Sequence, residues 1–150
     1  MSDSARTDSS LPDRFYSISY KNDGILDRGA MKVKVTFHHN VDDAREIDLY
    51  LEDIMTMYAK NKPFSILYNA SGVSAANPKH LQRLGAFMDT KEDESKRLII
   101  ACAVVLPNPA VRTLVKTIVL FKESSSPLSI CKNVPEAHKF LQRFETDPHA

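Results

Sequence analysis

The sequence predicts an α/β domain: a mixed, mostly parallel sheet of about five strands with four helices, in the order β-β-α-β-α-β-α-β-α. Apolar residues recur at every second position early in the chain, and at every third or fourth position in later segments. Two nearly continuous apolar runs, 64–70 and 98–106, are typical of strands covered on both faces. Strands that alternate with helices in this way favour right-handed parallel crossovers.

The first elements are a predicted antiparallel strand pair and a long helix. Tyr16, Ile18 and Tyr20 alternate with polar residues, and the apolar residues of 31–37 do the same after a polar turn at 22–24. We expect Asn40 or Asp42 to cap the helix that follows. The apolar stripe of this helix contains Ala44, Ile47, Leu51, Ile54, Met55 and Tyr58.

A strand-then-helix unit comes next. The run 64–70 is followed by Asn77-Pro78, a cap residue and a proline that together predict the start of a second helix. The charged run 89–97 is expected to be a solvated helix end and loop, and 98–106 is the expected central strand. The second helix should bury Leu81, Leu84, Phe87 and Met88.

The last third of the chain predicts two further helices around a short strand at 128–131. Asn108-Pro109 repeats the helix start signal, and Asn133 with Glu136 forms a capping box for the final helix. The third helix should bury Val111, Leu114, Val115, Ile118 and Phe121. The final helix should bury Ala137, Phe140, Leu141 and Phe144.

Length and composition are those of one globular domain. The chain has 150 residues, of which 43% are hydrophobic and 26% charged, with a formal net charge of +1. We expect a disordered tail at 1–13, rich in Ser, Asp and Thr, and a single domain at 14–146. Balanced charge gives no reason to expect a nucleic acid as partner.

The surroundings in which the chain works are predicted from its apolar segments. No apolar run approaches the roughly 20 residues of a membrane-spanning helix, and the N-terminus lacks the layout of a secretory signal. Cys102 and Cys131 lie in apolar strand-like runs, which is typical of buried thiols in a reducing compartment. We therefore expect a cytoplasmic protein.

Catalytic, cofactor and metal motifs are missing from the sequence. No Gly-x-Ser-x-Gly elbow occurs, and a chain with only 4 glycines has no P-loop or Rossmann phosphate loop. Cys102 is expected to be buried and inert. His38 and His39 are adjacent in a strand, so they point to opposite faces and cannot easily chelate one ion. We therefore expect no enzyme activity, no cofactor and no metal site.

Three passages of the sequence carry a resemblance to a known family: the strand and small loop at 66–73, the strand and helix start at 99–112, and the closing segment Glu136-Ala137-His138-Lys139-Phe140-Leu141. Together they resemble the SpoIIAA-like branch of the STAS domain superfamily. The resemblance covers 15–144. It implies a βα superhelix with strands mostly in sequence order, and non-enzymatic binding of other proteins or, in some members, of nucleotides or small apolar ligands. In the bacterial anti-anti-sigma members of the family, a serine in an Asp-Ser-Ser-Gly loop before the second helix is phosphorylated. This sequence has Asn77-Pro78-Lys79-His80 there, so we do not carry that switch over.

The segment between the third strand and the second helix is the best candidate for a binding site, because ligands tend to bind at this edge of a parallel sheet. Free amides at the helix start could receive an anion, with positive charge from the two basic residues there; the alternative is a plain connection closed by an Asn-Pro cap. The start of the third helix should lie at the same edge, where Arg112 belongs either to a solvated helix face or to a ridge for an acidic partner. The candidate residues are Asn69, Ser71, Gly72, Ser74, Asn77, Lys79, His80, Asn108 and Arg112.

Our first functional hypothesis is a regulatory protein-interaction module that acts through these residues. The alternative is a carrier of a small apolar ligand or lipid, in the manner of CRAL-TRIO-like proteins. Met55, Met57 and Met88 would suit such a pocket, although their helical spacing fits core packing better. An unrecognised enzyme ranks third. Homodimerisation through apolar or edge surfaces stays open, and the partner itself cannot be named.

Overall fold

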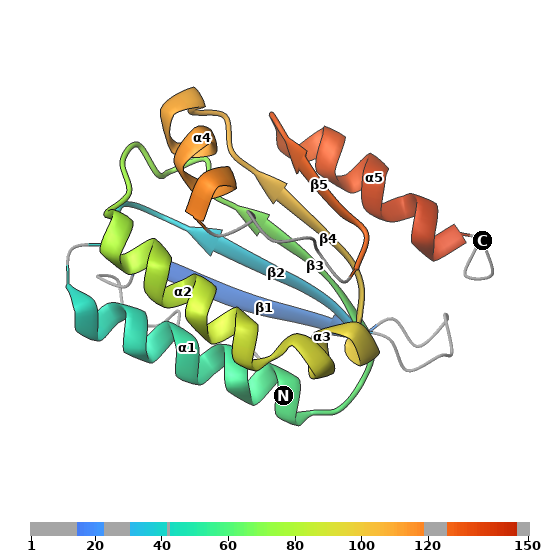
Figure 1. Ribbon diagram of the computed structural model, residues 1–150. Helices are drawn as coiled ribbons and strands as arrows, with labels where there is room; N and C mark the ends of the chain where they lie inside the picture. Colours follow the sequence, from blue (N-terminus) through green and yellow to red (C-terminus); the bar gives the residue numbers. More distant parts are fainter. Residues whose placement is uncertain (1–14, 23–30, 42, 119–125, 147–150) are drawn as a thin grey trace.

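A computed structural model describes residues 15–22, 31–41, 43–118 and 126–146 (Figure 1). Its strands are β1 (Tyr16–Asn22), β2 (Met31–Phe37), β3 (Phe64–Asn69), β4 (Ile99–Val105) and β5 (Leu128–Cys131). Its helices are α1 (Ala44–Ala59), α2 (Pro78–Thr90), α3 (Glu92–Leu98), α4 (Pro109–Ile118) and α5 (Val134–Thr146). The predicted tail at 1–13, the turn at 23–24 and Phe121 lie outside the described residues.

The five strands form one sheet in the order β1-β2-β3-β4-β5, the same as their order in the sequence. β1 pairs with β2 antiparallel, and every later pair is parallel. The predicted fold class is therefore confirmed, and so is the interior position of the strand at 98–106. The strand order also agrees with what the SpoIIAA-like resemblance implies.

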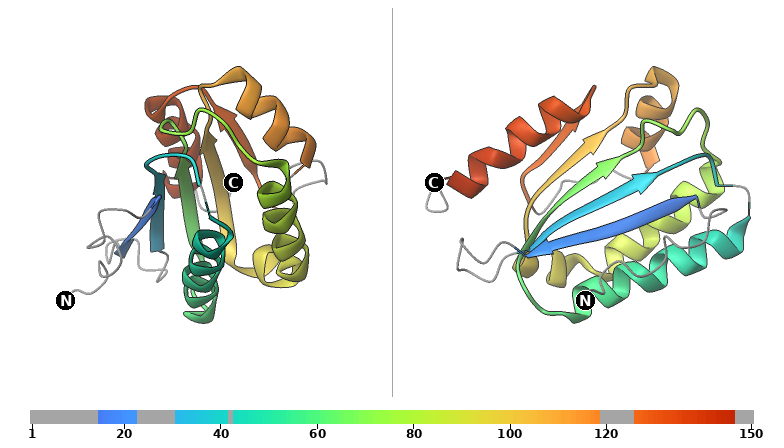
Figure 2. Two further views of the ribbon diagram at one scale, coloured as in Figure 1. Left: turned by 90° about the vertical axis from the view of Figure 1, so that its left-hand side faces the viewer. Right: turned by 180° about the vertical axis from the view of Figure 1, so that it is seen from behind.

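Helices cover the two faces of the sheet unequally. α1, α2 and α4 lie on one face, and α5 lies alone on the other (Figure 2). Between α5 and the sheet, the small side chains of Ala101 and Ala103 from β4 and of Ala137 from α5 are fully buried and allow close packing. The opposite core is aromatic and aliphatic, and it joins α1 to β1, β2 and β3. This face, which α1, α2 and α4 cover, contains an open space that is described below.

The prediction of four helices was wrong, because the charged run at 92–98 forms the additional helix α3. Glu92, Asp93 and Glu94 occupy its first turn, and Lys96 and Arg97 its last turn, so the charges complement the helix dipole. The single buried residue is Leu98, which is too little for an apolar stripe to be visible in the sequence.

The prediction of which residues form the buried face of α1 was also partly wrong. Met55 is 48% exposed, whereas Tyr50 and Met57 are buried. The N-cap is neither of the expected residues: the side chain of Asp43 accepts a hydrogen bond from the amide of Arg45 at 2.9 Å. Asn40 is instead engaged with a distant loop, and Asp42 lies outside the described residues.

Candidate functional site

The loop after β3 is held in place by two asparagines. The Oδ1 atom of Asn69 accepts hydrogen bonds from the Oγ of Ser71 at 2.7 Å and from its amide at 3.1 Å. From the other side, the Oδ1 of Asn40 accepts from the amides of Ser74 and Ala75 at 2.9 and 3.2 Å. The Nδ2 of Asn40 donates to the Oγ of Ser74 at 3.2 Å. This exposed loop is therefore ordered before any partner arrives.

Gly72 allows this loop to approach the end of β2. A Cβ atom at this position would lie 2.6 Å from the carbonyl oxygen of His38 and 2.8 Å from that of Phe37. Both are backbone atoms that cannot turn aside, so only glycine fits here without a shift of the chain. Glycine is thus required at position 72 because the loop packs closely against the end of β2.

The start of α2 does not offer the free amides that the sequence suggested. Asn77 accepts a hydrogen bond from the amide of Lys79 on its Oδ1 at 2.8 Å. Its carbonyl accepts from His80 and Leu81 at 3.0 and 3.1 Å, and Pro78 has no amide hydrogen. An anion would have to displace Asn77, so the expected anion site does not fit the geometry.

The start of α4 lies beside this loop, as expected. Ala70, Leu106 and Val111 form a small buried cluster that joins the two segments. Asn108 caps the helix by accepting from the amide of Val111 at 3.1 Å. Arg112 donates through Nε to the carbonyl of Leu106 at 3.0 Å and through Nη2 to that of Pro107 at 3.1 Å. Its guanidinium therefore anchors the end of β4 and does not stand free for a partner.

A cavity of about 460 Å³ lies between α2 and the sheet, with walls from α1 and α4. α2 has 13 residues, and only Leu81 is buried. Leu84 and Phe87 are half-buried and Met88 is 43% exposed, although all three line the cavity. The apolar face of α2 thus packs only in part against the core, and open space lies between the rest of it and the sheet. The expectation that Met88 is buried was therefore wrong.

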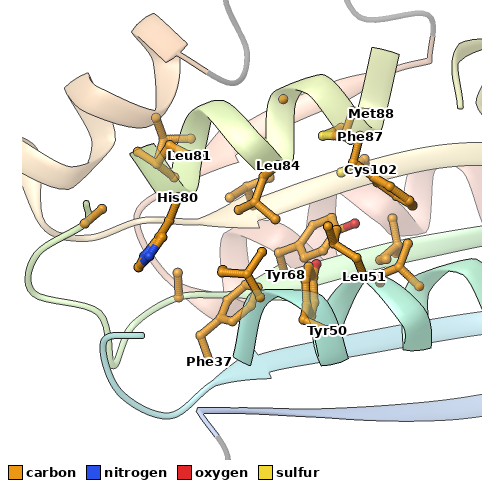
Figure 3. A pocket seen from close by; sticks show the side chains of 18 of the residues that line it. Phe37, Tyr50, Leu51, Tyr68, His80, Leu81, Leu84, Phe87, Met88 and Cys102 are labelled. Atoms are coloured by element: carbon orange, nitrogen blue, oxygen red, sulfur yellow. The ribbon is translucent and has the colours of Figure 1, made fainter. Parts of the chain in front are cut away.

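The interior of this α2 cavity is apolar with a few polar atoms. Tyr50 from α1 and Tyr68 from β3 meet in its middle below Leu84, whereas His80 lies near Phe37 at the end next to the loop (Figure 3). The side chains of Tyr50 and Tyr68 lie next to one another there (Figure 3). Burial raises the pKa values of both phenols above their usual range, so both stay neutral.

Further polar groups of the cavity wall are relevant to its chemistry. Cys102 is only partly buried, against expectation, because its side chain faces the cavity. Burial away from bulk water raises the pKa of its thiol to about 12. The Nδ1 atom of His80 is buried and has no hydrogen-bond partner among the described residues. The hydroxyl of Tyr58 lies 2.8 Å from the Oγ of Ser95.

The histidine pair stays at the surface. The Nε2 of His38 lies 3.1 Å from the Oγ of Ser17, and the Nδ1 of His39 lies 2.8 Å from the carbonyl oxygen of Asn40. Across the ranges that the structure describes, no three His, Cys, Asp or Glu residues gather in a way that could hold a metal ion. None of the described helices is long and apolar enough to cross a bilayer.

The sequence patterns did not reveal two residues that matter for the cavity and for the loop beside it. Tyr50, which lines the cavity, was absent from the predicted stripe of α1, and Asn40, which holds the loop, was expected only as a cap. Gly85 was not considered, although a glycine inside a helix weakens it and asks for a reason. Gly85 lines the cavity. A glycine inside a predicted helix is a signal that the sequence alone already contains.

Comparison with known proteins places the chain in a family. Residues 22–145 match the model of DUF7793, which is described as a domain of unknown function. The chain belongs to this family. No curated protein matches the sequence. One solved structure is similar to this DUF7793 domain, an anti-sigma factor antagonist from Mycobacterium paratuberculosis. The identity is 12%, the match covers 85% of this chain and 94% of that one, and the TM-score is 0.49.

Proposed function

We propose that this DUF7793 domain is a non-enzymatic binding module that holds a small, mostly apolar molecule in the α2 cavity. The observation that carries the proposal is the partly unpacked apolar face of α2. Leu84, Phe87 and Met88 line the cavity of about 460 Å³ and keep part of their surface exposed. Leu84 and Phe87 also touch the core, so the face is packed on one side only. Protein interiors are normally close-packed, so an apolar face that borders open space is a place for a missing occupant.

The size and lining of the cavity suit a small molecule. Ligand sites usually have volumes of about 300–1,000 Å³ and are mainly apolar with a few polar groups. At roughly 30 Å³ for each water-sized group, the cavity holds a ligand of about 15 such groups. Each Å² of apolar surface removed from water contributes about 25 cal/mol, which favours a ligand that fills this space.

The chemistry of the walls supports binding without catalysis. Cys102 is the strongest potential nucleophile that lines the cavity, and its thiol pKa of about 12 keeps it protonated. The phenols of Tyr50 and Tyr68 are neutral for the same reason, because burial raises their pKa values. Neither kind of group is activated for nucleophilic attack or proton abstraction.

An NMR titration of the full chain with 2-isopropylnaphthalene tests the proposal. We expect saturable shifts at Tyr68, Leu84 and Cys102, with a dissociation constant in the micromolar range. The methyl groups of Ala137 and Leu141, which belong to α5 and pack against the other face of the sheet, should not respond. Shifts spread evenly over both faces, or none up to the solubility limit, would remove the cavity as a binding site.

A second proposal concerns the exposed edge made by Asn69–His80 and Asn108–Arg112, which we call the rim. We propose that the rim contacts a partner protein, and the support is its order, since Asn40 and Asn69 hold the loop in one conformation. A preordered loop loses little entropy on binding. Affinity capture with Lys79→Glu and with the wild type should recover the same protein in different amounts. Equal recovery with both proteins would count against the rim.

A further inference from the structure

Two phenol hydroxyls meet in the middle of the α2 cavity. Together they have more hydrogens to donate than a bond between them can use. Tyr50 and Tyr68 lie next to one another and both line the cavity. Each hydroxyl has one hydrogen to donate. A bond between the two hydroxyls can use only one of these hydrogens, so at least one remains for a third group. This is true whichever of the two residues is the donor.

The pair retains this spare hydrogen under ordinary conditions. Burial is the main cause of the raised pKa values of both tyrosines, so neither loses its proton near neutral pH. Figure 3 shows both rings directed into the space below α2, with Leu84 above them. A ligand in the cavity therefore meets a hydrogen-bond donor in a mainly apolar wall. An unpaired buried donor costs about 1–3 kcal/mol, which favours a ligand that carries an acceptor.

The charges around the cavity exclude an acidic ligand. Among the described residues, no Lys or Arg lines the cavity, whereas Asp89 and Glu92 do. Bringing a carboxylate into such a site costs several kcal/mol, because burial is not repaid by a cation. His80 is the only basic side chain in the described wall, and it lies at the far end beside the loop.

We propose that the ligand of the α2 cavity is a neutral, mostly apolar molecule with a carbonyl-type oxygen that accepts a hydrogen bond from the Tyr50–Tyr68 pair. Ketones, esters and quinones belong to this class. The inference rests on the proposed function and adds the chemistry of the ligand to it. The donor pair fixes the position of the oxygen, and the apolar wall receives the rest of the molecule.

Three probes of equal size separate this inference from the proposed function. They are 2-acetylnaphthalene, 2-isopropylnaphthalene and 2-naphthoate, which differ in having a carbonyl, no polar atom or a charge. Each is titrated into the wild type and into the double variant Tyr50→Phe/Tyr68→Phe. Phenylalanine keeps the shape of the tyrosine ring, and removing both hydroxyls leaves neither of them unpaired, so this variant should fold.

We expect the affinity for 2-acetylnaphthalene, relative to 2-isopropylnaphthalene, to fall about tenfold in the double variant. The single variants Tyr50→Phe and Tyr68→Phe should keep this ratio, because each leaves one hydroxyl with a free hydrogen. Tyr16→Phe is the matched control. Its hydroxyl donates to Asp53 at 2.5 Å, and Tyr16 does not line the cavity.

The possible failures have different meanings. An unchanged affinity ratio in the double variant overturns the inference while the proposed function stands. Tightest binding of 2-naphthoate also overturns it, because the site would then accept an acid. Absence of binding by all three probes to the wild type removes both the inference and the proposed function.

Discussion

Replacing Gly85 by leucine should make the protein more stable and its ligand binding weaker. Gly85 lies inside α2 on the same helix face as Leu81, Leu84 and Met88, and it lines the cavity. A leucine side chain at this position should enter the cavity and fill part of it. The same space would then be lost to a ligand.

The size of both effects follows from the structure. Leucine is a better helix former than glycine by about 0.7 kcal/mol. Burying its side chain fully would contribute about 1.5–3 kcal/mol, of which roughly 1 kcal/mol applies in a partly open cavity. The total of about 1.7 kcal/mol should raise the melting temperature by about 5 °C in a chain of this length. Four added carbons take up roughly 120 Å³ of the 460 Å³ cavity.

Thermal unfolding by circular dichroism and titration with 2-isopropylnaphthalene measure the two effects. We expect a higher melting temperature and an affinity at least tenfold lower. Ala86→Leu is the matched control, because the neighbouring Ala86 is exposed and does not line the cavity. It should change stability by less than about 0.5 kcal/mol and leave binding unchanged.

Gly85→Ala separates helix propensity from cavity filling. It should raise stability by about 1 kcal/mol and largely retain probe binding. A melting temperature that rises for Gly85→Ala but falls below the wild type for Gly85→Leu would refute the reasoning, since it would show that α2 has no room for the larger side chain. Unchanged probe affinity in Gly85→Leu would refute it as well.

Three further predictions test the loop and the cavity wall. Gly72→Ala should lower the urea midpoint by an amount equivalent to about 1–3 kcal/mol, because its Cβ would lie 2.6 Å from a backbone oxygen of the chain beside it. Asn40→Ala should speed amide hydrogen exchange at Ser74 and Ala75 about tenfold, whereas Asn40→Asp, which keeps the acceptor oxygen, should do so less. Cys102 should resist thiol reagents at pH 8 until the protein is unfolded. Because burial raises its pKa from 9.0 to about 12, its contribution to stability is complete below pH 9 and should be lost as the pH rises toward 12.

Local patterns in the sequence determined the order and type of most elements. Alternation with a period of two predicted β1 and β2, and the continuous run at 98–106 predicted an interior strand. Asn77 and Asn108 were predicted as helix caps, and their side chains accept from the amides of the first turns. These features depend on neighbours within about four residues, which is why they can be read from the chain alone.

The helix α3 and the phase of α1 show where local patterns become ambiguous. α3 is held by its charges and by the burial of Leu98, so it lacks the apolar repeat by which helices are recognised. In α1, apolar residues occur on both sides of the stripe, and Met55 and Met57 compete for the core. The position of β3 and of the aromatic residues of β1 and β2 decides that Met57 is buried and Met55 is exposed.

The sequence by itself determined that helices pack over a mostly parallel sheet and that the loop after β3 meets the start of α4. Only the tertiary structure decided that α2 stands away from the sheet and leaves a cavity with Tyr50 and Tyr68 in its middle. An amphipathic helix has the same sequence pattern whether its apolar face meets a strand or an empty space. The distance between two packed elements depends on all the side chains around them, and no local pattern contains that distance.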